Sequence, residues 1–305
     1  LVTMWRTDPE SARLCLTCHA PLAEQQPEHR AIYDTGLQRQ GLACAACHVR
    51  QHRRFGPPRR AGAPPPPVNA RLPHDGATRT PAFLSSRFCA SCHQFDDDGA
   101  ALNGKLLENT YAEWSASPAA RRGLQCQDCH MPDRRHLWRG IHDPAMVRSG
   151  LTITLETDRP RYRPNDEVRA RLTIESTGVG HHFPTYVTPR VVVRTALVDT
   201  QGRELRGSAE ERYIGRAVSA DLTRELSDTR IPAGGRFTLE YRRRLEGTPG
   251  VRLRALVRVE PDYFYTGFFQ SVLNDAGAGA ADIRTALEAS RRSAFELYRR
   301  DVPLM

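Results

Sequence analysis

The second half of the chain contains short strand-like runs, and apolar and polar residues alternate in those at residues 151–157 and 168–176. Five strand-like runs lie at residues 151–157, 168–176, 190–198, 236–245 and 251–259. A period of two is typical of strands that bury one face. Asp199-Thr200-Gln201-Gly202 follows the third run and predicts a hairpin whose short second arm is residues 203–205. Several short strands separated by turns predict an antiparallel sandwich.

One helical pattern follows these strands. Residues 282–300 place apolar side chains on one helical face, and these are Ile283, Ala286, Leu287, Ala294, Leu297 and Tyr298. We therefore predict an α+β protein. Its C-terminal part, residues 151–305, is expected to be an antiparallel Ig-like β-sandwich with a C-terminal helix.

Residues 1–150 lack the alternation and predict a separate domain of short helices and loops. A helix is expected over residues 108–117, with Pro118 at a helix boundary. Residues 51–82 are rich in proline, glycine and arginine, which predicts extended loop. The change of pattern places the predicted domain boundary near residue 150.

All eight cysteines lie in this first domain and form four copies of C-x-x-C-H. The copies are Cys15-Leu-Thr-Cys18-His19, Cys44-Ala-Ala-Cys47-His48, Cys89-Ala-Ser-Cys92-His93 and Cys126-Gln-Asp-Cys129-His130. This spacing is the attachment site of a c-type haem, because two thiols about one helical turn apart reach the vinyl groups at one edge of the porphyrin. The histidine that follows is the proximal ligand of the iron. The sequence thus predicts four covalently bound haems c.

Two other interpretations of the cysteines were weighed. Pairing the C-x-x-C units into Cys₄ zinc sites leaves the histidine of every motif unexplained. A disulfide framework is disfavoured because adjacent C-x-x-C cysteines rarely bridge outside redox motifs. Four haems in residues 1–150 leave few side chains for an ordinary core. The haems are therefore expected to form most of that core, packed as closely as electron transfer needs.

Seven further histidines are candidates for the sixth ligand position of the irons. Ligation by two histidines is the expected arrangement, and methionine ligation would raise the reduction potential. The five predicted distal ligands are His52, His74, His136, His142 and His181. The other two, His29 and His182, are expected at the surface. The alternative for each of the five is a surface or propionate-binding histidine, because spacing does not pair ligands with haems.

His181 is unusual because it belongs to the β half of the chain. It lies in Gly180-His181-His182-Phe183-Pro184-Thr185. Side chains of a histidine pair on a strand point to opposite faces, so one of them could turn toward the haem domain. Such a ligand would tie the two domains through an iron–nitrogen bond. The alternative is a plain loop at a domain interface.

The chain carries a formal charge of +9, and Lys105 is the single lysine among 44 basic residues. Nucleic-acid binding is not expected, because haem propionates offset positive charge and the planar fork of arginine pairs with carboxylates. A solvated basic surface accounts for most of the remaining arginines. No run is long and apolar enough to predict a transmembrane segment.

Covalent haem is attached outside the bacterial cytoplasm, yet no signal peptide is visible at Leu1. The sequence is therefore expected to be the mature form, with a signal peptide already removed. The predicted location is periplasmic or extracellular.

The four motifs, the stretch Asn109–Ser115 before the fourth motif, and Met131-Pro132 after it resemble the multihaem c-type cytochromes. The resemblance is greatest to tetrahaem members related to the electron carrier of hydroxylamine oxidation, here with an appended C-terminal β domain. It implies electron transfer outside the cytoplasm. Some relatives polymerise into filaments in which a neighbouring subunit donates a ligand histidine.

Three details bear on that resemblance. Relatives place a ligand histidine in a W-x-x-S-x-H-A stretch, whereas here Pro118 follows Ser117 and the ligand is lost. The segment Arg139-Gly140-Ile141-His142 resembles a family G-x-H ligand segment. Tyr186 stands where glycine is usual in the G-H-x-F-P-T-G segment of relatives with β domains.

Three functions are open at this point. The first is electron transfer to redox partner proteins or to other copies of the chain, as a shuttle, a homo-oligomer or a filament. The second is a multihaem oxidoreductase with one open haem that acts on a small nitrogen or sulfur compound, because the ligand near Pro118 is missing. In the third, the sandwich binds a partner or a cell-surface polymer and the haems are cargo.

Overall fold

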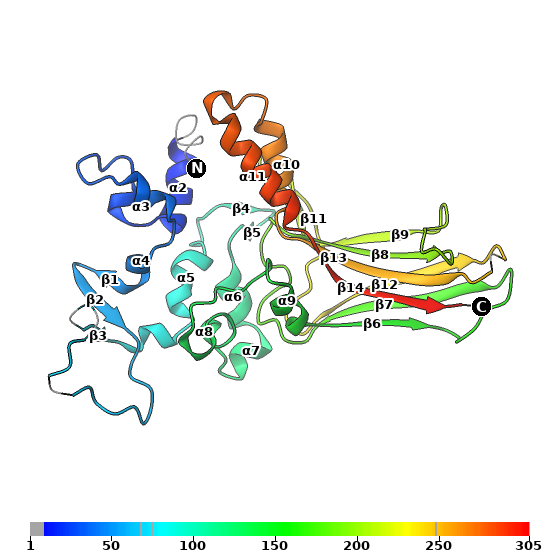
Figure 1. Ribbon diagram of the computed structural model, residues 1–305, viewed down its shortest axis with the longest axis horizontal. Helices are drawn as coiled ribbons and strands as arrows, with labels where there is room; N and C mark the ends of the chain where they lie inside the picture. The colour runs from blue at the N-terminus through cyan, green and yellow to red at the C-terminus, as the bar shows by residue number, and fades with distance from the viewer. Residues whose placement is uncertain (1–8, 68, 73, 75, 248, 305) are drawn as a thin grey trace. The chain divides into compact units, whose positions relative to one another are not determined.

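The computed structural model describes residues 9–67, 69–72, 74, 76–247 and 249–304 (Figure 1). The chain forms two compact units that meet between Cys92 and His93, within helix α5 (Arg87–His93). The change of pattern near residue 150 falls inside the second unit, where α9 (Pro144–Gly150) leads directly into strand β6 (Leu151–Thr157).

The first unit consists of short helices and one small sheet. Its elements are α2 (Pro9–His19), η1 (Ala23–Gln25), α3 (Thr35–Arg39), α4 (Cys44–His48), β1 (Val49–Arg50), β2 (Arg53–Gly56), β3 (Thr78–Arg79), η3 (Pro81–Leu84) and most of α5. Strand β2 pairs with β1 antiparallel and with β3 parallel. Residues 51–82, predicted as extended loop, contain β2, β3 and the start of η3, so the prediction is wrong for these short elements.

A buried glutamine holds the segment between the first two motifs. Gln25 is fully buried, and its Nε2 atom donates to the carbonyl oxygens of Leu37, at 2.9 Å, and Gly41, at 2.6 Å. Its Oε1 atom accepts from the Leu22 amide at 3.0 Å. A buried amide with these partners is satisfied, and it fixes a loop that has few apolar side chains of its own.

The second unit begins with a helical segment that carries the fourth motif. Its elements are β4 (Ala101–Leu102), β5 (Lys105–Leu106), α6 (Thr110–Ser115), α7 (Pro118–Arg121), α8 (Cys126–His130), η4 (Pro132–Arg134) and α9. The helix predicted over residues 108–117 is confirmed as α6. Pro118 opens α7 because its missing N–H costs nothing in the first turn, and the Ser117 hydroxyl caps that helix by accepting from the Ala120 amide at 3.3 Å.

Two antiparallel sheets form the remainder of the second unit (Figure 1). One has the order β12-β7-β6 and the other the order β14-β13-β8-β9. Besides β6, the strands of these two sheets are β7 (Glu167–Ser176), β8 (Arg190–Val198), β9 (Glu210–Ile214), β12 (Arg236–Arg244), β13 (Arg252–Glu260) and β14 (Phe295–Pro303). A separate ribbon pairs β10 (Arg216–Val218) with β11 (Glu225–Asp228).

Both sheets contribute to one hydrophobic core. Leu172 and Ile174 of β7 belong to the same buried cluster as Val193 of β8 and Val257 of β13. In β7 buried and exposed residues alternate, as the sequence pattern predicts. The α+β class and the antiparallel sheets are therefore confirmed, while the Ig-like classification stays a prediction.

A small truncation in this core is expected to lower stability measurably. Ile174 has no exposed surface, so Ile174→Val removes one buried methyl group and leaves a small cavity. The expected loss is about 1 kcal/mol in the free energy of unfolding, measured by urea denaturation. Thr154→Ser, on the exposed side of β6, is the control that should change stability little.

The predicted helix over residues 282–300 is wrong in its second half. Helix α11 (Ala280–Arg292) ends earlier, and the following residues form β14 along the edge of β13. Leu297 and Tyr298 fit a helical face, but the open backbone edge of β13 offers them strand pairing instead. Helix α10 (Tyr263–Val272) and turn η5 (Gly277–Gly279) were not predicted. Among the described helices, none combines the length and the apolar composition needed to cross a membrane.

Candidate functional site

The four C-x-x-C-H motifs share one local structure. Each lies in a short helix, and the motif histidine is the last residue of that helix, in α2, α4, α5 and α8. Residues i and i+3 of a helix lie on the same face, with about 5–6 Å between their Cβ atoms. Both thiols of a motif therefore face the same side, as attachment to one porphyrin edge requires.

None of the eight cysteines is in a disulfide. Burial raises the pKa of the Cys47 thiol, so it is protonated at neutral pH. Within the described residues, no three side chains of His, Cys, Asp or Glu gather as they would around a metal ion. A haem does not need such a cluster, because the porphyrin fills four positions and the protein supplies one or two axial ligands.

Two motif histidines are held by backbone carbonyls. The Nδ1 atom of His48 lies 2.9 Å from the Phe55 oxygen, and Nδ1 of His130 lies 2.6 Å from the Arg139 oxygen. A carbonyl only accepts, so Nδ1 carries the proton in each ring and Nε2 is the basic nitrogen. This is the tautomer in which a histidine binds a metal through Nε2.

The imidazole ring of His181 lies near that of His130. The centroids of the two imidazole rings are 6.3 Å apart, and the ring planes differ by 13°. Nδ1 of His181 is 2.8 Å from the carbonyl oxygen of His182, so this ring also presents a basic Nε2 atom. Burial lowers the pKa of His181, which keeps the imidazole neutral. The structure therefore brings together one predicted proximal and one predicted distal ligand.

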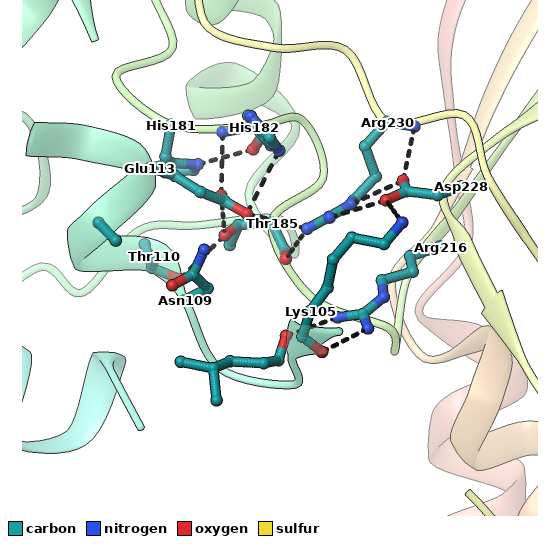
Figure 2. Close-up of polar contacts among 12 residues, drawn as sticks. Lys105, Asn109, Thr110, Glu113, His181, His182, Thr185, Arg216, Asp228 and Arg230 are labelled. Atoms are coloured by element: carbon teal, nitrogen blue, oxygen red, sulfur yellow. Dashed lines mark hydrogen bonds and ion pairs between the residues drawn. The ribbon is translucent and has the colours of Figure 1, made fainter. Parts of the chain in front are cut away.

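The loop that carries His181 is anchored to helix α6 by one buried carboxylate (Figure 2). The Glu113 side chain is 3% exposed and accepts from the His182 amide at 3.1 Å and from the Thr185 hydroxyl at 2.6 Å. Arg230 reaches the same carboxylate at 2.9 Å, and Nδ1 of His182 lies 3.3 Å from it. These bonds satisfy a buried charge and fix the position of His181 relative to α6.

A second buried cation ties the β4–β5 hairpin to the β ribbon (Figure 2). The Arg216 side chain is 1% exposed and pairs with Glu225 at 2.8 Å. It also donates to three backbone carbonyl oxygens of the hairpin, those of Leu102, Lys105 and Leu106, at 3.0, 2.8 and 2.6 Å. The hairpin precedes α6 in the chain, so Arg216, by holding the hairpin, also supports the helix that carries Glu113.

Asp228 adds a further charge to this cluster. Lys105 and Arg230 contact its carboxylate at 2.7 and 2.9 Å. Burial alone would raise the pKa of Asp228, but the hydrogen bonds from Arg230 and Lys105 bring it well below its usual range. The carboxylate is therefore ionised, and the cluster is a charge-balanced support.

The third motif differs from the second and fourth in the partner of its histidine. The Nδ1 atom of His93 lies 2.9 Å from the hydroxyl of Tyr186 instead of a backbone carbonyl. Tyr186 in turn shares a side-chain hydrogen bond with Thr110, and Thr110 lies 2.7 Å from a carboxyl oxygen of Glu108. Burial raises the pKa of Tyr186 well above its usual range and raises that of Glu108 to about 7. A chain of hydrogen bonds therefore leads from His93 to a half-protonated carboxyl.

Among the solved structures that match the chain is one with a similar fold over most of its length. A penta-heme cytochrome c552 from Thermochromatium tepidum superposes with a TM-score of 0.66 at 19% sequence identity, over 95% of this chain and 84% of that chain. This chain has the fold of that cytochrome. Spo0M from Bacillus subtilis and the DNA glycosylase AlkC from Pseudomonas fluorescens also match, at TM-scores of 0.17 and 0.20. No protein-family description and no curated protein matches the chain.

The other predicted distal ligands lie elsewhere. His52 and His74 are exposed in the first unit, at left-handed backbone positions with φ of 58° and 55°. His136 is exposed beside Trp138, with ring centroids 6.0 Å apart. His142 is 61% exposed, and its Nε2 atom is 3.0 Å from the Asp262 carboxylate. For His142 that contact occupies the nitrogen that a metal would otherwise use.

Sequence reasoning missed the polar residues that support the histidines. Glu113, Thr185 and Arg230 carry no spacing signal, because their partners are distant in the chain. Glu108, whose partner Thr110 is two residues away, belongs to no motif. The stretches that contain Glu113 and Thr185 were noticed only as family-like segments. Tyr186 was noticed as a departure from the family pattern, but its contact with His93 was not foreseen.

Proposed function

We propose that this chain is a multihaem c-type cytochrome that transfers electrons through four covalently attached haems. The four C-x-x-C-H motifs at helix ends support the haem number, and the likeness to a penta-heme cytochrome supports the general class. Each haem would be attached by the two cysteines of one motif and held at the iron by His19, His48, His93 or His130. When bound, the haems would supply the one-electron chemistry of their irons.

The observation that carries the proposal is the geometry of His130 and His181. A ring nitrogen lies about 2.0 Å from a metal that it binds, and the ring centre lies about 1.1 Å beyond it. Two imidazoles on opposite faces of one iron therefore have centroids about 6.3 Å apart. The observed separation is 6.3 Å, and both rings have the tautomer that exposes Nε2. The separation of the two rings therefore equals the one that ligation of a single iron by both histidines would require.

Further features of the proposal concern the domains, the remaining distal ligands and the family relation. Residues 1–150 would be the tetrahaem domain, and residues 151–305 an Ig-like sandwich that lends His181 as a ligand. The remaining irons would take distal ligands from His52, His74, His136 or His142. A relation to the electron carrier of hydroxylamine oxidation remains part of the proposal.

The proposed setting is outside the cytoplasm, in the periplasm or the extracellular space. Attachment of covalent haem in that compartment supports this location. The partners would be redox proteins or other copies of the chain, in a shuttle, a homo-oligomer or a filament. Neither nucleic acid nor a membrane-spanning segment has a part in the proposal.

A second candidate function is an oxidoreductase with one open haem for a small nitrogen or sulfur compound. The observation that favours it is the position of His142, whose Nε2 atom is engaged by Asp262. An iron deprived of that ligand would have a sixth position available for a substrate. The two candidates differ in the ligation of a single iron.

Haem content and spin state test the proposal and separate the candidates. The pyridine haemochrome of the purified chain is expected to give four haems per chain, and the haem stain should survive denaturation because attachment is covalent. For electron transfer, paramagnetic resonance should show low-spin irons, and carbon monoxide should bind none after reduction. Carbon monoxide at about one haem in four would favour the enzyme instead. A chain that carries no haem after export with its maturation system would overturn both.

A further inference from the structure

Six residues of the second unit form one hydrogen-bonded network, which we call the relay. They are His93, Glu108, Thr110, Glu113, Thr185 and Tyr186. Five bonds join them: His93 to Tyr186 at 2.9 Å, Tyr186 to Thr110, Thr110 to Glu108 at 2.7 Å, Thr110 to Thr185 at 2.9 Å and Thr185 to Glu113 at 2.6 Å. The two carboxyl groups end the two branches.

The relay has one hydrogen too few if both carboxyls are ionised. A carboxylate only accepts, so the hydrogens must come from the Nδ1 atom of His93 and from the three hydroxyls of Thr110, Thr185 and Tyr186. Four hydrogens cannot serve five bonds. A proton on one carboxyl supplies the fifth and completes the network.

Glu108 is the carboxyl that holds this proton. Glu113 faces the Arg230 guanidinium at 2.9 Å and accepts from the His182 amide, so its negative charge is compensated. No described contact gives Glu108 a cation. Burial, together with the nearby charge of Glu113, raises the pKa of Glu108 to about 7, although hydrogen bonds from Thr110 oppose the shift. The proton is thus bound to Glu108 near neutral pH and lost slightly above it.

We propose that Glu108 takes up a proton when the iron held by His93 is reduced, so that electron transfer at the third motif is coupled to proton binding. This inference rests on the proposed function, because it needs a haem on the third motif. The relay supplies the connection: Nδ1 of His93 contacts Tyr186, and Tyr186 reaches Glu108 through the single hydroxyl of Thr110.

The step balances in charge and atoms. An external electrode supplies one electron, which reduces the iron from ferric to ferrous. The solvent supplies one proton, which forms the O–H bond of the Glu108 carboxylic acid. The net charge of the site is unchanged, so the buried region avoids an additional uncompensated negative charge. Glu108 is only partly buried, and protons from solvent can therefore reach it.

The charged and titratable groups around Glu108 determine whether reduction of the iron raises or lowers the pKa of Glu108. Those facing it or its relay partners are Glu113 on α6, Tyr186 on the loop after Thr185, His93 on α5 and Cys126 on α8. Arg230 lies against Glu113 and compensates the charge of Glu113 rather than that of Glu108, and Nδ1 of His182 also contacts Glu113. An added electron repels the carboxylate charge and raises the pKa of Glu108. Glu108 has one pKa in the oxidised protein and a higher one in the reduced protein. At pH values between these two, reduction is therefore accompanied by the binding of a proton.

Redox titration of the full haem-loaded chain at several pH values tests the coupling. In the native chain one haem potential should fall as pH rises above about 7, with a limiting slope of about 59 mV per pH unit for one proton per electron. In Glu108→Gln, which is always neutral, that potential should stay at its acidic value. The variant and the native chain should thus agree at pH 5 and diverge above pH 7. Glu156→Gln, an exposed glutamate of β6, should keep the native slope.

Two further measurements keep the test decisive. Thr110→Val removes the central hydroxyl without changing the side-chain shape, and it should reduce the slope at least twofold. Infrared spectra at pH 6 should contain a protonated carboxyl band that Glu108→Gln lacks, whatever the haem does. Four haems with equal pH slopes in the native chain and in Glu108→Gln would overturn the coupling alone. A chain without haem would overturn the proposed function, and the infrared band would still report whether Glu108 binds the proton.

Discussion

Replacement of His181 by alanine is expected to convert one haem in four from low-spin to high-spin. The reason is that the imidazole ring of His181 lies near that of His130, with ring centroids 6.3 Å apart, and a methyl group cannot replace the Nε2 atom of His181 as a ligand. Absorption and paramagnetic resonance spectra of the oxidised variant should show the new high-spin iron. After reduction, carbon monoxide should bind to one haem per chain, whereas the native chain should bind none.

His181→Met provides the sharper form of this test. A thioether can ligate the iron and favours the ferrous state, so the variant should stay low-spin while one reduction potential rises. His29→Ala removes an exposed histidine of the first unit and is the matched control, which should keep the native spectrum. A low-spin spectrum in His181→Ala that binds no carbon monoxide would show that a residue other than His181 is the second ligand of the iron held by His130.

Replacement of Arg216 by alanine is expected to cost about 3–5 kcal/mol in the free energy of unfolding. The Arg216 side chain is 1% exposed, and its removal leaves Glu225 and three backbone carbonyl oxygens without their guanidinium partner. Buried acceptors that lose their donor pay the full cost of desolvation. Urea denaturation followed by the circular dichroism of the sheets measures the loss.

Arg212→Ala is the matched control for Arg216. Arg212 also pairs with a carboxylate, that of Glu210 at 2.6 Å, but its side chain is 61% exposed. Exposed pairs of this kind contribute about 0–1 kcal/mol, so the control should unfold almost as the native chain does. A loss below 1 kcal/mol in Arg216→Ala would mean that water replaces the guanidinium and that the β4–β5 hairpin is not held by it.

Strands of the second unit could be predicted because short local patterns mark them: β7 alternates, whereas β8 is a short, largely apolar run. The predicted runs 151–157 and 190–198 match β6 and β8 residue for residue. In β7, buried and exposed residues alternate along the strand. The prediction for the end of the chain was wrong for a related reason. Leu297 and Tyr298 fit both a helix face and a strand, and pairing with β13, which is distant in sequence, decided between them.

The residues of the candidate site also divide into those that a local pattern reveals and those that it does not. The motif cysteines and histidines carry their chemistry in a local spacing, and the structure adds that each motif closes a helix. The partner of His130 depends on a contact with a loop of the β half, so spacing could name His181 as a candidate but could not pair it. Tyr186 acts through a contact between segments and Glu108 through its near neighbour Thr110, and no local pattern marks either residue.

The origin of His181 has a consequence for the maturation of the protein. Along the chain, Cys126, Cys129 and His130 precede the loop with His181 and strand β12, the partner of β7. A haem attached early at this motif would wait for its second axial ligand until the later strands exist and the Glu113 contacts form. The colour of that one haem would then report completed folding of a region that contains no haem at all.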